Sequence, residues 1–191
     1  MAFIPNTAFE ARIVNDRFDD LANIAGVFDE YCPAGLLCVR NGQTECEGFP
    51  DIMNDNAWRM TPAGADANID VPVYACDPHD WPLIGNSHNQ LWAVGVETLG
   101  LGIIAGRYGS FRRIHFDNVS VYRFGIGNLS AALGNNGYFI IGDGLLLPTA
   151  AAPTAAGSIY FALKGTGNFT EGTTASFQYV DVVACRVSVA A

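Results

Sequence analysis

The sequence predicts an all-β protein, a single β-sandwich or β-barrel domain with an extended N-terminal arm and one short helix. Two observations support this fold class. Short runs of apolar, aromatic and β-branched residues recur along the chain, and clusters of Gly, Asp, Asn, Thr and Pro separate them. The clearest runs lie near the C-terminus, at 138–141, 159–163 and 177–189. About ten short runs of this kind fit a sandwich or a barrel.

The N-terminal residues 1–30 are predicted to form an arm and a short helix, and the β domain is predicted to span 31–191. Pro5 and Asn6 disfavour an early helix, so residues 1–8 are expected to be extended. From Phe9 onward, apolar residues recur every three to five positions between acidic and Asn residues. This spacing predicts one short amphipathic helix within 17–28, which Gly26 weakens near its C-terminal end.

The middle of the chain is predicted to contain short strands joined by turns. These strands are expected at 36–40, 44–47, 57–60 (at an edge), 71–76, 91–96, 111–116 and 119–124. Asn41-Gly42 is the strongest short hairpin signal in the chain. Pro72 places its strand at an edge or at a strand start, because proline has no N–H to donate. Asp117-Asn118 is a second turn pair.

Long loops are predicted at 49–70, 77–90 and 142–157, since these stretches are rich in turn residues. Another loop at 125–137 is expected to hold one helical turn at 129–133. The stretch LLLPTAAAPTAAG, at 145–157, carries no charge and is rich in Pro and Ala. We therefore expect it to form an exposed, extended tongue that offers apolar side chains to a partner.

The composition narrows the classes of partner. Half of the residues are hydrophobic and 15% are charged, well below the usual quarter, which suggests that other chains cover part of the surface. A net charge of −9 disfavours binding to nucleic acid and to anionic membranes. Because the chain has no run of 18 apolar residues and no basic n-region followed by an apolar stretch, we expect neither a membrane span nor a secretory signal.

The sequence offers no complete cofactor or metal site. Residues 100–105 match the dinucleotide pattern GxGxxA, but no helix start follows, so a Gly-rich turn or bulge is the better interpretation. Cys76 and His79, with His88 nearby, form only part of a zinc ligand set. The acidic loop at 66–70 lacks the Gly and the terminal Glu of an EF-hand. We therefore predict no cofactor and no metal.

Catalytic side chains are also sparse. The five cysteines are odd in number and no secretory signal accompanies them, so free, buried thiols are expected at Cys32, Cys38, Cys46, Cys76 and Cys185. A cysteine nucleophile would need a nearby His base, and only His79, His88 and His115 are present, without a local signature. A glycosidase-type carboxylate pair stays open, because its members can be far apart in sequence. We predict that the protein is not an enzyme.

Two stretches of the sequence have a recognisable form. The first is the PAG turn with the β run after it, CPAGLLCVRNG from Cys32 to Gly42. The second is the Gly-rich closing β segment, GTGNFT from Gly165 to Thr170, which ends in VVACRV at 182–187. In these stretches the chain resembles bacteriophage capsid decoration proteins, also called head cement proteins. The resemblance is one of general pattern over about two thirds of the chain, and the long loops depart from the shorter members of this group.

The resemblance implies a small, β-rich virion structural protein without enzymatic activity. It would be made in the host cytoplasm, bind the outer capsid surface and stabilise junctions between subunits. Its partners would be the major capsid protein and copies of itself in a trimer, with no nucleic acid and no membrane. The predicted contacts are Phe3, Ile4 and Phe9 in the arm and Leu145, Leu146, Leu147 and Pro148 in the tongue.

Three alternatives remain open at this point. Another virion role, such as a tail or head-fibre component, suits the same residues. A carbohydrate-binding β-sandwich would use loop aromatics such as Trp81 together with loop carboxylates. A hydrolase would require either two convergent carboxylates or a contact between a Cys and a His.

Overall fold

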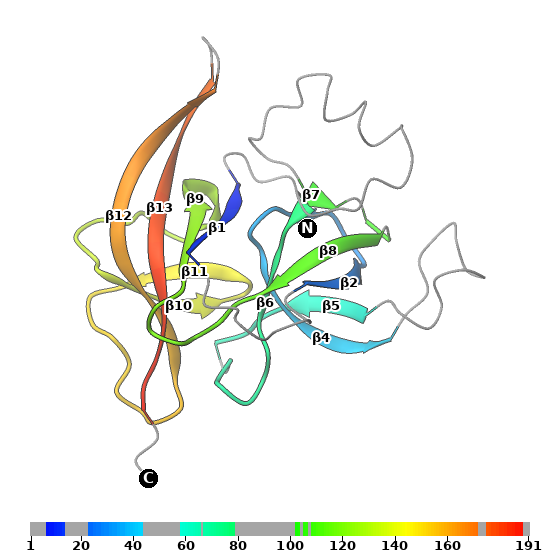
Figure 1. Cartoon of the computed structure of the whole chain (residues 1–191), viewed down its shortest axis with the longest axis horizontal. Helices are drawn as coiled ribbons and strands as arrows, with labels where there is room; N and C mark the ends of the chain where they lie inside the picture. The colour runs from blue at the N-terminus through cyan, green and yellow to red at the C-terminus, as the bar shows by residue number, and fades with distance from the viewer. Residues whose placement is uncertain are drawn as a thin grey trace.

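The computed structural model describes residues 7–13, 23–43, 58–65, 67–78, 102–103, 105–106, 108–171 and 175–188. Strands are the main element of these residues, and a turn of 3-10 helix, η2, lies at Ile126–Asn128. The predicted all-β class is therefore confirmed. The strands build two main bodies that lie side by side, a six-stranded sheet and a small closed barrel (Figure 1).

The six-stranded sheet is antiparallel throughout, in the order β1-β9-β13-β12-β10-β11. Its strands are β1 (Phe9–Ile13), β9 (Val121–Gly125), β13 (Ala175–Arg186), β12 (Ile159–Glu171), β10 (Tyr138–Gly142) and β11 (Leu145–Thr149). The two longest strands, β12 and β13, form a hairpin that rises beyond the rest of the sheet (Figure 1). The sequence runs at 138–141, 159–163 and 177–189 correctly located β10, β12 and β13.

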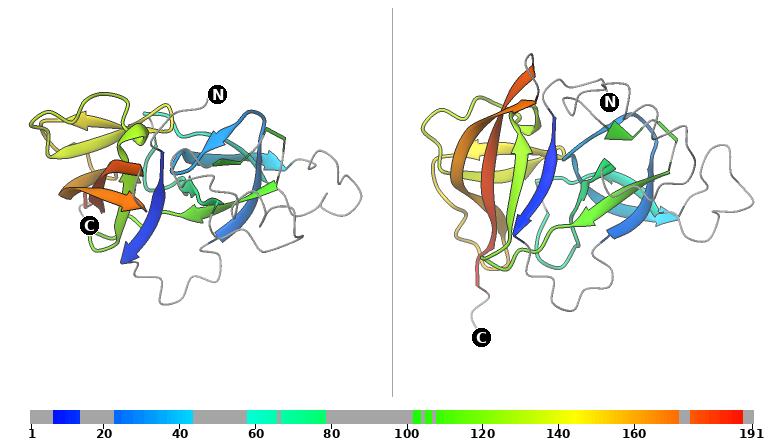
Figure 2. Two further views of the ribbon diagram at one scale, coloured as in Figure 1. Left: turned by 90° about the horizontal axis from the view of Figure 1, so that it is seen from above. Right: turned by 45° about the horizontal axis from the view of Figure 1, so that its top comes forward.

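The barrel closes in the order β2-β5-β4-β6-β8, with β8 pairing back onto β2. Its strands are β2 (Asn23–Phe28), β5 (Trp58–Pro62), β4 (Leu37–Gln43), β6 (Tyr74–Cys76) and β8 (Tyr108–Arg113). A two-stranded ladder joins β3 (Cys32–Pro33) to β7 (Gly102–Ile103). Figure 2 shows the barrel beside the sheet in both of its views.

The main core lies between the sheet and the barrel. The sheet contributes stacked and edge-on aromatic rings, among them Phe124 and Phe161, whose centroids are 5.9 Å apart. The barrel contributes side chains on its outer surface, such as Leu37 and Ala75, which belong to the same buried cluster. A second cluster, which includes Phe111, fills the barrel itself. The two bodies therefore share one buried layer.

The helix predicted within 17–28 is wrong over residues 23–28, which form strand β2; residues 17–22 lie outside the described residues. The run from Ile24 to Phe28 pairs with β5 and β8, and its consecutive residues Val27 and Phe28 are both buried, so it shows no apolar–polar alternation. A Cβ at Gly26 would lie 2.6 Å from Met60 Cγ and 2.8 Å from Phe111 Cδ2. Gly26 is thus required by close packing inside the barrel and does not mark a weak helix end.

The N-terminal residues 7–13 are part of the folded sheet and do not form a free arm. Phe9 is 2% exposed and its ring packs 5.3 Å from that of Phe124. Thr7 is also buried. Of the two strands described within residues 1–30, β1 belongs to the sheet and β2 to the barrel.

Asn41-Gly42 does not close a hairpin, because β4 continues through it to Gln43. Between Arg40 and Gln43, β4 has one more residue than its partner β5, and Gly42 has a φ of 77°. The pair therefore forms a β-bulge, the other common use of a left-handed Gly in a strand. The strand predicted at 57–60 is also not an edge strand, since β5 pairs with both β2 and β4.

The predicted tongue at 145–157 begins as a strand. Gly142 and Leu145 are paired across a two-residue turn in which Asp143 and Gly144 have φ values of 51° and 75°. Positive φ at both positions is the type I′ geometry, and Asp-Gly is one of its preferred sequences. The first residues of the tongue are therefore β11, paired to β10, and are not a free loop.

Several short elements lie at positions that differ from the predicted ones. The helical turn expected at 129–133 lies just upstream, as η2. The strands predicted at 111–116 and 119–124 exist as β8 and β9, but the turn at Asp117-Asn118 connects the barrel to the sheet. The strand predicted at 71–76 starts two residues after Pro72, as β6. The predicted strands at 44–47 and 91–96, and most of the loop at 77–90, lie outside the described residues.

Two sets of hydrogen bonds connect the sheet to the barrel, one made by the Asn128 side chain and one by the Gly144 backbone. Asn128 is 1% exposed; its Oδ1 accepts a hydrogen bond from Ala8 N–H at 3.1 Å, and its Nδ2 donates to the Ala34 carbonyl at 2.7 Å. At the β10–β11 turn, Gly144 N–H donates to Ala63 O and Leu37 N–H donates to Gly144 O, both at 2.8 Å. These bonds set the orientation of the two bodies.

Candidate binding site

The six-stranded sheet has one face that no second layer of the described residues covers, which we call the outer face. Successive side chains of a strand point to opposite faces, so the residues that alternate with the core residues lie here. On β10, β11, β12 and β13 these residues are mostly apolar, and apart from Leu145, which packs against the barrel core, none is assigned to a core cluster. The apolar half of the outer face consists of Tyr138, Ile140, Leu147, Tyr160, Ala162 and Val183.

The residues of the apolar half are neighbours across the strands. Ile140 is directly opposite Leu147, which is 37% exposed. The rings of Tyr138 and Tyr160 meet edge to face, with centroids 6.1 Å apart. Side chains at directly paired positions lie within contact distance, so this set forms a continuous surface across four strands. Aromatic rings with a polar tip are enriched where proteins bind proteins.

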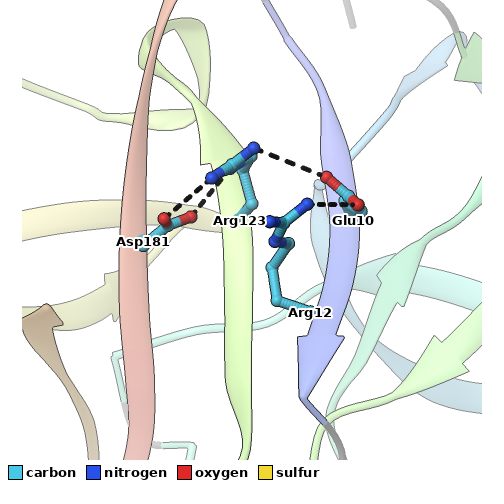
Figure 3. A network of polar contacts seen from close by, with 4 residues as sticks. All are labelled: Glu10, Arg12, Arg123 and Asp181. Carbon is cyan, nitrogen blue, oxygen red and sulfur yellow. Dashed lines mark hydrogen bonds and ion pairs between the residues drawn. The ribbon is translucent and has the colours of Figure 1, made fainter. Parts of the chain in front are cut away.

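The polar half of the outer face is built around Arg123 on β9 (Figure 3). Its guanidinium donates to both carboxylate oxygens of Asp181 on β13, at 2.8 and 2.9 Å, and lies 3.7 Å from Glu10 on β1. Arg12 pairs with the same Glu10 at 2.8 Å. The guanidinium also lies over the ring of Tyr179, 3.6 Å from its centroid.

This network is built to hold strands together and is unsuited to acid–base chemistry. The hydrogen bonds to Asp181 raise the pKa of Arg123 further, with a smaller contribution from the charge of Glu10, so the guanidinium is permanently charged. Both carboxylates that converge here, Glu10 and Asp181, are bound to that guanidinium. They therefore do not form a free pair of the glycosidase type.

Replacing Arg123 with Met is expected to lower the free energy of unfolding by about 1–3 kcal/mol, because Asp181 would lose its partner while remaining largely buried. The side chains of Arg123 and Asp181 are 14% and 22% exposed. The change would be measured by urea unfolding.

The double variant R123M/D181L is the control, since it removes the orphaned charge and should recover part of the loss. The single variant D181L completes the comparison. If the loss of unfolding free energy in the double variant equals the sum of the losses in R123M and D181L, the Arg123–Asp181 pair contributes no coupling energy. The network would then not be a strand-fixing element.

The thiol chemistry considered for a hydrolase is not supported by the described cysteines. Cys32, Cys38, Cys76 and Cys185 are free and buried, as predicted; Cys46 lies outside the described residues. Burial is the main cause that raises the pKa of the thiols of Cys32, Cys76 and Cys185. These three thiols are therefore protonated at neutral pH and are poor nucleophiles.

The seven predicted contact residues do not form one surface. Phe9 and Leu146 are core residues, at 2% and 1% exposure, and their side chains fill the space under the sheet. Leu145 and Pro148 are partly buried, and Leu147 lies on the outer face. Phe3 and Ile4 lie outside the described residues.

The free edge of β11 is partly covered. Leu129 forms a bridge to Leu146, whose carbonyl accepts a hydrogen bond from Ser130 N–H at 2.9 Å, and Pro148 has no N–H to offer. The contribution of β11 to the candidate site is therefore its outward side chain, Leu147, and not its backbone edge.

Sequence reasoning did not identify Tyr138, Ile140 and Tyr160 as site residues. The signal was present in YFII and IYFAL, where both alternating sets are apolar. A strand with one solvated face normally alternates apolar and polar residues, so apolar residues on both faces indicate a second covered surface.

The structure describes some of the residues of the other sites that we considered from the sequence. Within the GxGxxA stretch, Gly102 lies in strand β7 and pairs with Pro33, and an added Cβ there would clash with the Cys32 carbonyl. Within the acidic loop, Asn68 Oδ1 accepts a hydrogen bond from Asp70 N–H, which is an ordinary Asx turn. His79, His88 and Trp81 lie outside the described residues.

No group of three or more His, Cys, Asp or Glu side chains in the described part of the chain is arranged to hold a metal ion. The described residues also include no helix that is long and apolar enough to cross a bilayer. The outer face thus remains the best-defined candidate site. Comparison with protein-family models, with curated proteins and with solved structures finds no match to this chain.

Proposed function

We propose that this protein is a structural binding module that attaches to other protein subunits through the apolar half of its outer face. The observation that carries the proposal is the continuous apolar surface over β10, β11, β12 and β13. A sheet face exposed only to water would normally carry polar residues at these positions. The low charged fraction of 15% agrees with a surface that other chains cover.

More specifically, we propose that the protein is a capsid decoration protein, which binds the major capsid protein and copies of itself, as a trimer, on the outside of a virion. The resemblance of Cys32–Gly42 and of the closing β segment to head cement proteins supports this proposal, as does the all-β fold. Burial of apolar surface would provide about 25 cal/mol per Å², from which the costs of association are subtracted. A net charge of −9 favours a partner surface that is neutral or basic.

The first test is sedimentation velocity on native, unfractionated material that contains the chain. We expect it to migrate with a very large particle and to be released only by stripping or denaturing conditions. Purified protein should then rebind the stripped particles. Migration of all the native material as a free monomer or trimer would contradict the proposal.

A charge substitution tests the surface itself. The double variant I140E/L147E should lower the amount bound to stripped particles at least tenfold, because two carboxylates would be desolvated in an apolar interface. Binding would be measured by co-sedimentation, with far-UV circular dichroism to confirm folding.

The matched control is V119E, which adds a carboxylate at a residue that is 56% exposed in the connection between β8 and β9, outside the outer face. This variant should bind like the unmodified protein. Equal binding by I140E/L147E and the unmodified protein would show that attachment uses another surface.

A further inference from the structure

A groove of about 440 Å³ lies between the β12–β13 hairpin and the segment that follows β9. Its volume falls within the range of small-ligand sites. The hairpin contributes one wall, with Thr166, Asn168 and Gln178, and the segment contributes the other, with Ile126, Ala132 and Leu133.

The hairpin wall is polar, uncharged and accessible. Thr166 is paired with Val180, a fully buried core residue, and Asn168 is paired with Gln178. The three polar side chains therefore lie on the core-facing side of the hairpin, beyond the end of the core, and all three are exposed. Gly167 and Tyr179 also line the groove, so it borders the polar half of the outer face, whereas no residue of the apolar half lines it.

The hydrogen-bonding groups of this wall are not used within the described part of the protein. Thr166, Asn168 and Gln178 make no side-chain hydrogen bond to any other described residue. Two amides and one hydroxyl thus present both donors and acceptors to the groove. None of the residues that line the groove is charged, so neither an anion nor a metal ion is a suitable ligand.

The opposite wall is apolar and anchored. Ile126 and Leu133 pack against the main core. The Leu133 carbonyl accepts hydrogen bonds from Asn136 Nδ2 at 3.0 Å and from Asn136 N–H at 3.1 Å. Leu129 N–H donates to Ile126 O at 3.2 Å. These bonds hold the wall in place before any ligand arrives, which lowers the entropic cost of binding.

The hairpin wall is stiffened by Tyr179, which also lines the groove. Its ring lies across Gly167, where an added Cβ would clash with the Tyr179 hydroxyl oxygen. The stacked Arg123 fixes the same ring. The base of the hairpin, and with it the spacing of the polar side chains, is therefore preorganised.

We propose that this groove binds a neutral carbohydrate. A sugar ring has an apolar C–H face, which suits Ile126 and Leu133, and a rim of hydroxyl groups, which suits the amides and the hydroxyl of the hairpin wall. Sites that combine an apolar surface with a few convergent, uncharged polar groups take ligands of this kind. The proposal does not require that the protein attach to a capsid.

The test uses the full chain and an array of neutral and anionic oligosaccharides. We expect binding to one or more neutral oligomers of glucose or N-acetylglucosamine. The same oligomer, titrated into ¹⁵N-labelled protein, should shift the side-chain amide resonances of Asn168 and Gln178. The double variant N168A/Q178A should bind at least tenfold more weakly.

The control is N41A, which removes an exposed amide from the barrel and should leave binding unchanged. Three outcomes would overturn the proposal: no oligosaccharide bound by the unmodified chain, binding restricted to anionic oligosaccharides, or equal binding by N168A/Q178A. Both altered side chains are exposed, so their removal should not prevent folding.

Discussion

Replacing Asn128 with Leu is expected to lower the free energy of unfolding by about 2–5 kcal/mol. The substitution keeps a similar volume but removes the acceptor of Ala8 N–H and the donor to the Ala34 carbonyl. Each backbone group left without a partner in a buried site costs about 1–3 kcal/mol. Because Asn128 joins the start of β1 to the barrel, the loss should affect the whole protein.

Urea unfolding, followed by far-UV circular dichroism and by tryptophan fluorescence, measures this change. The matched control is N135L, the same substitution at an exposed position seven residues along the chain. It should change the free energy of unfolding by less than about 0.5 kcal/mol. If N128L and N135L were equally stable, the two hydrogen bonds of Asn128 would contribute nothing to the junction.

Replacing Gly144 with Ala should lower the free energy of unfolding by about 2–4 kcal/mol. Gly144 has a φ of 75°, and a Cβ there would lie 2.8 Å from Leu36 Cδ1 and 3.0 Å from the Leu37 carbonyl. An L-residue is strained in the left-handed region, and the added methyl group would push the turn away from the barrel. Both backbone bonds of Gly144 to the barrel would lengthen.

The neighbouring glycine provides the control for this variant. A Cβ at Gly142 would meet Leu147 Cβ at 3.6 Å, an ordinary contact, so G142A should be nearly neutral. Thermal unfolding of the two variants under identical conditions would give the comparison. Equal melting temperatures for G142A and G144A would show that the turn does not depend on a left-handed glycine.

Strands of the sheet could be predicted where the local preference of the sequence for β structure matches the structure that the folded protein adopts. The runs that became β10, β12 and β13 are rich in aromatic and β-branched residues and are bounded by turn residues. The β10–β11 turn could have been found as well, because Asp143-Gly144 is as strong a hairpin sequence as Asn41-Gly42. Local sequence alone could not show that the first pair closes a hairpin and the second forms a bulge.

The error at β2 has a different physical origin. Consecutive residues Val27 and Phe28 point to opposite faces of β2 and are both buried, so the apolar run from Ile24 to Phe28 has no two-residue period that would separate it from a helix. Its partners β5 and β8 come from distant parts of the chain. The runs YFII and IYFAL indicate a second covered face, but which of their residues lie side by side on one surface depends on the register of β10, β11, β12 and β13.

The pairing of β1 with β9 also determines when the protein can fold. Phe9 pairs with Phe124, more than a hundred residues later, and β2 must wait for β8 before the barrel can close. At about 5–20 residues per second, the first strand would remain unpaired on the ribosome for roughly 5–20 s. Such a high contact order is typical of chains that fold in milliseconds to seconds after release. The nascent chain therefore has to keep its amphipathic N-terminal strand out of intermolecular contacts until most of the sequence has been made.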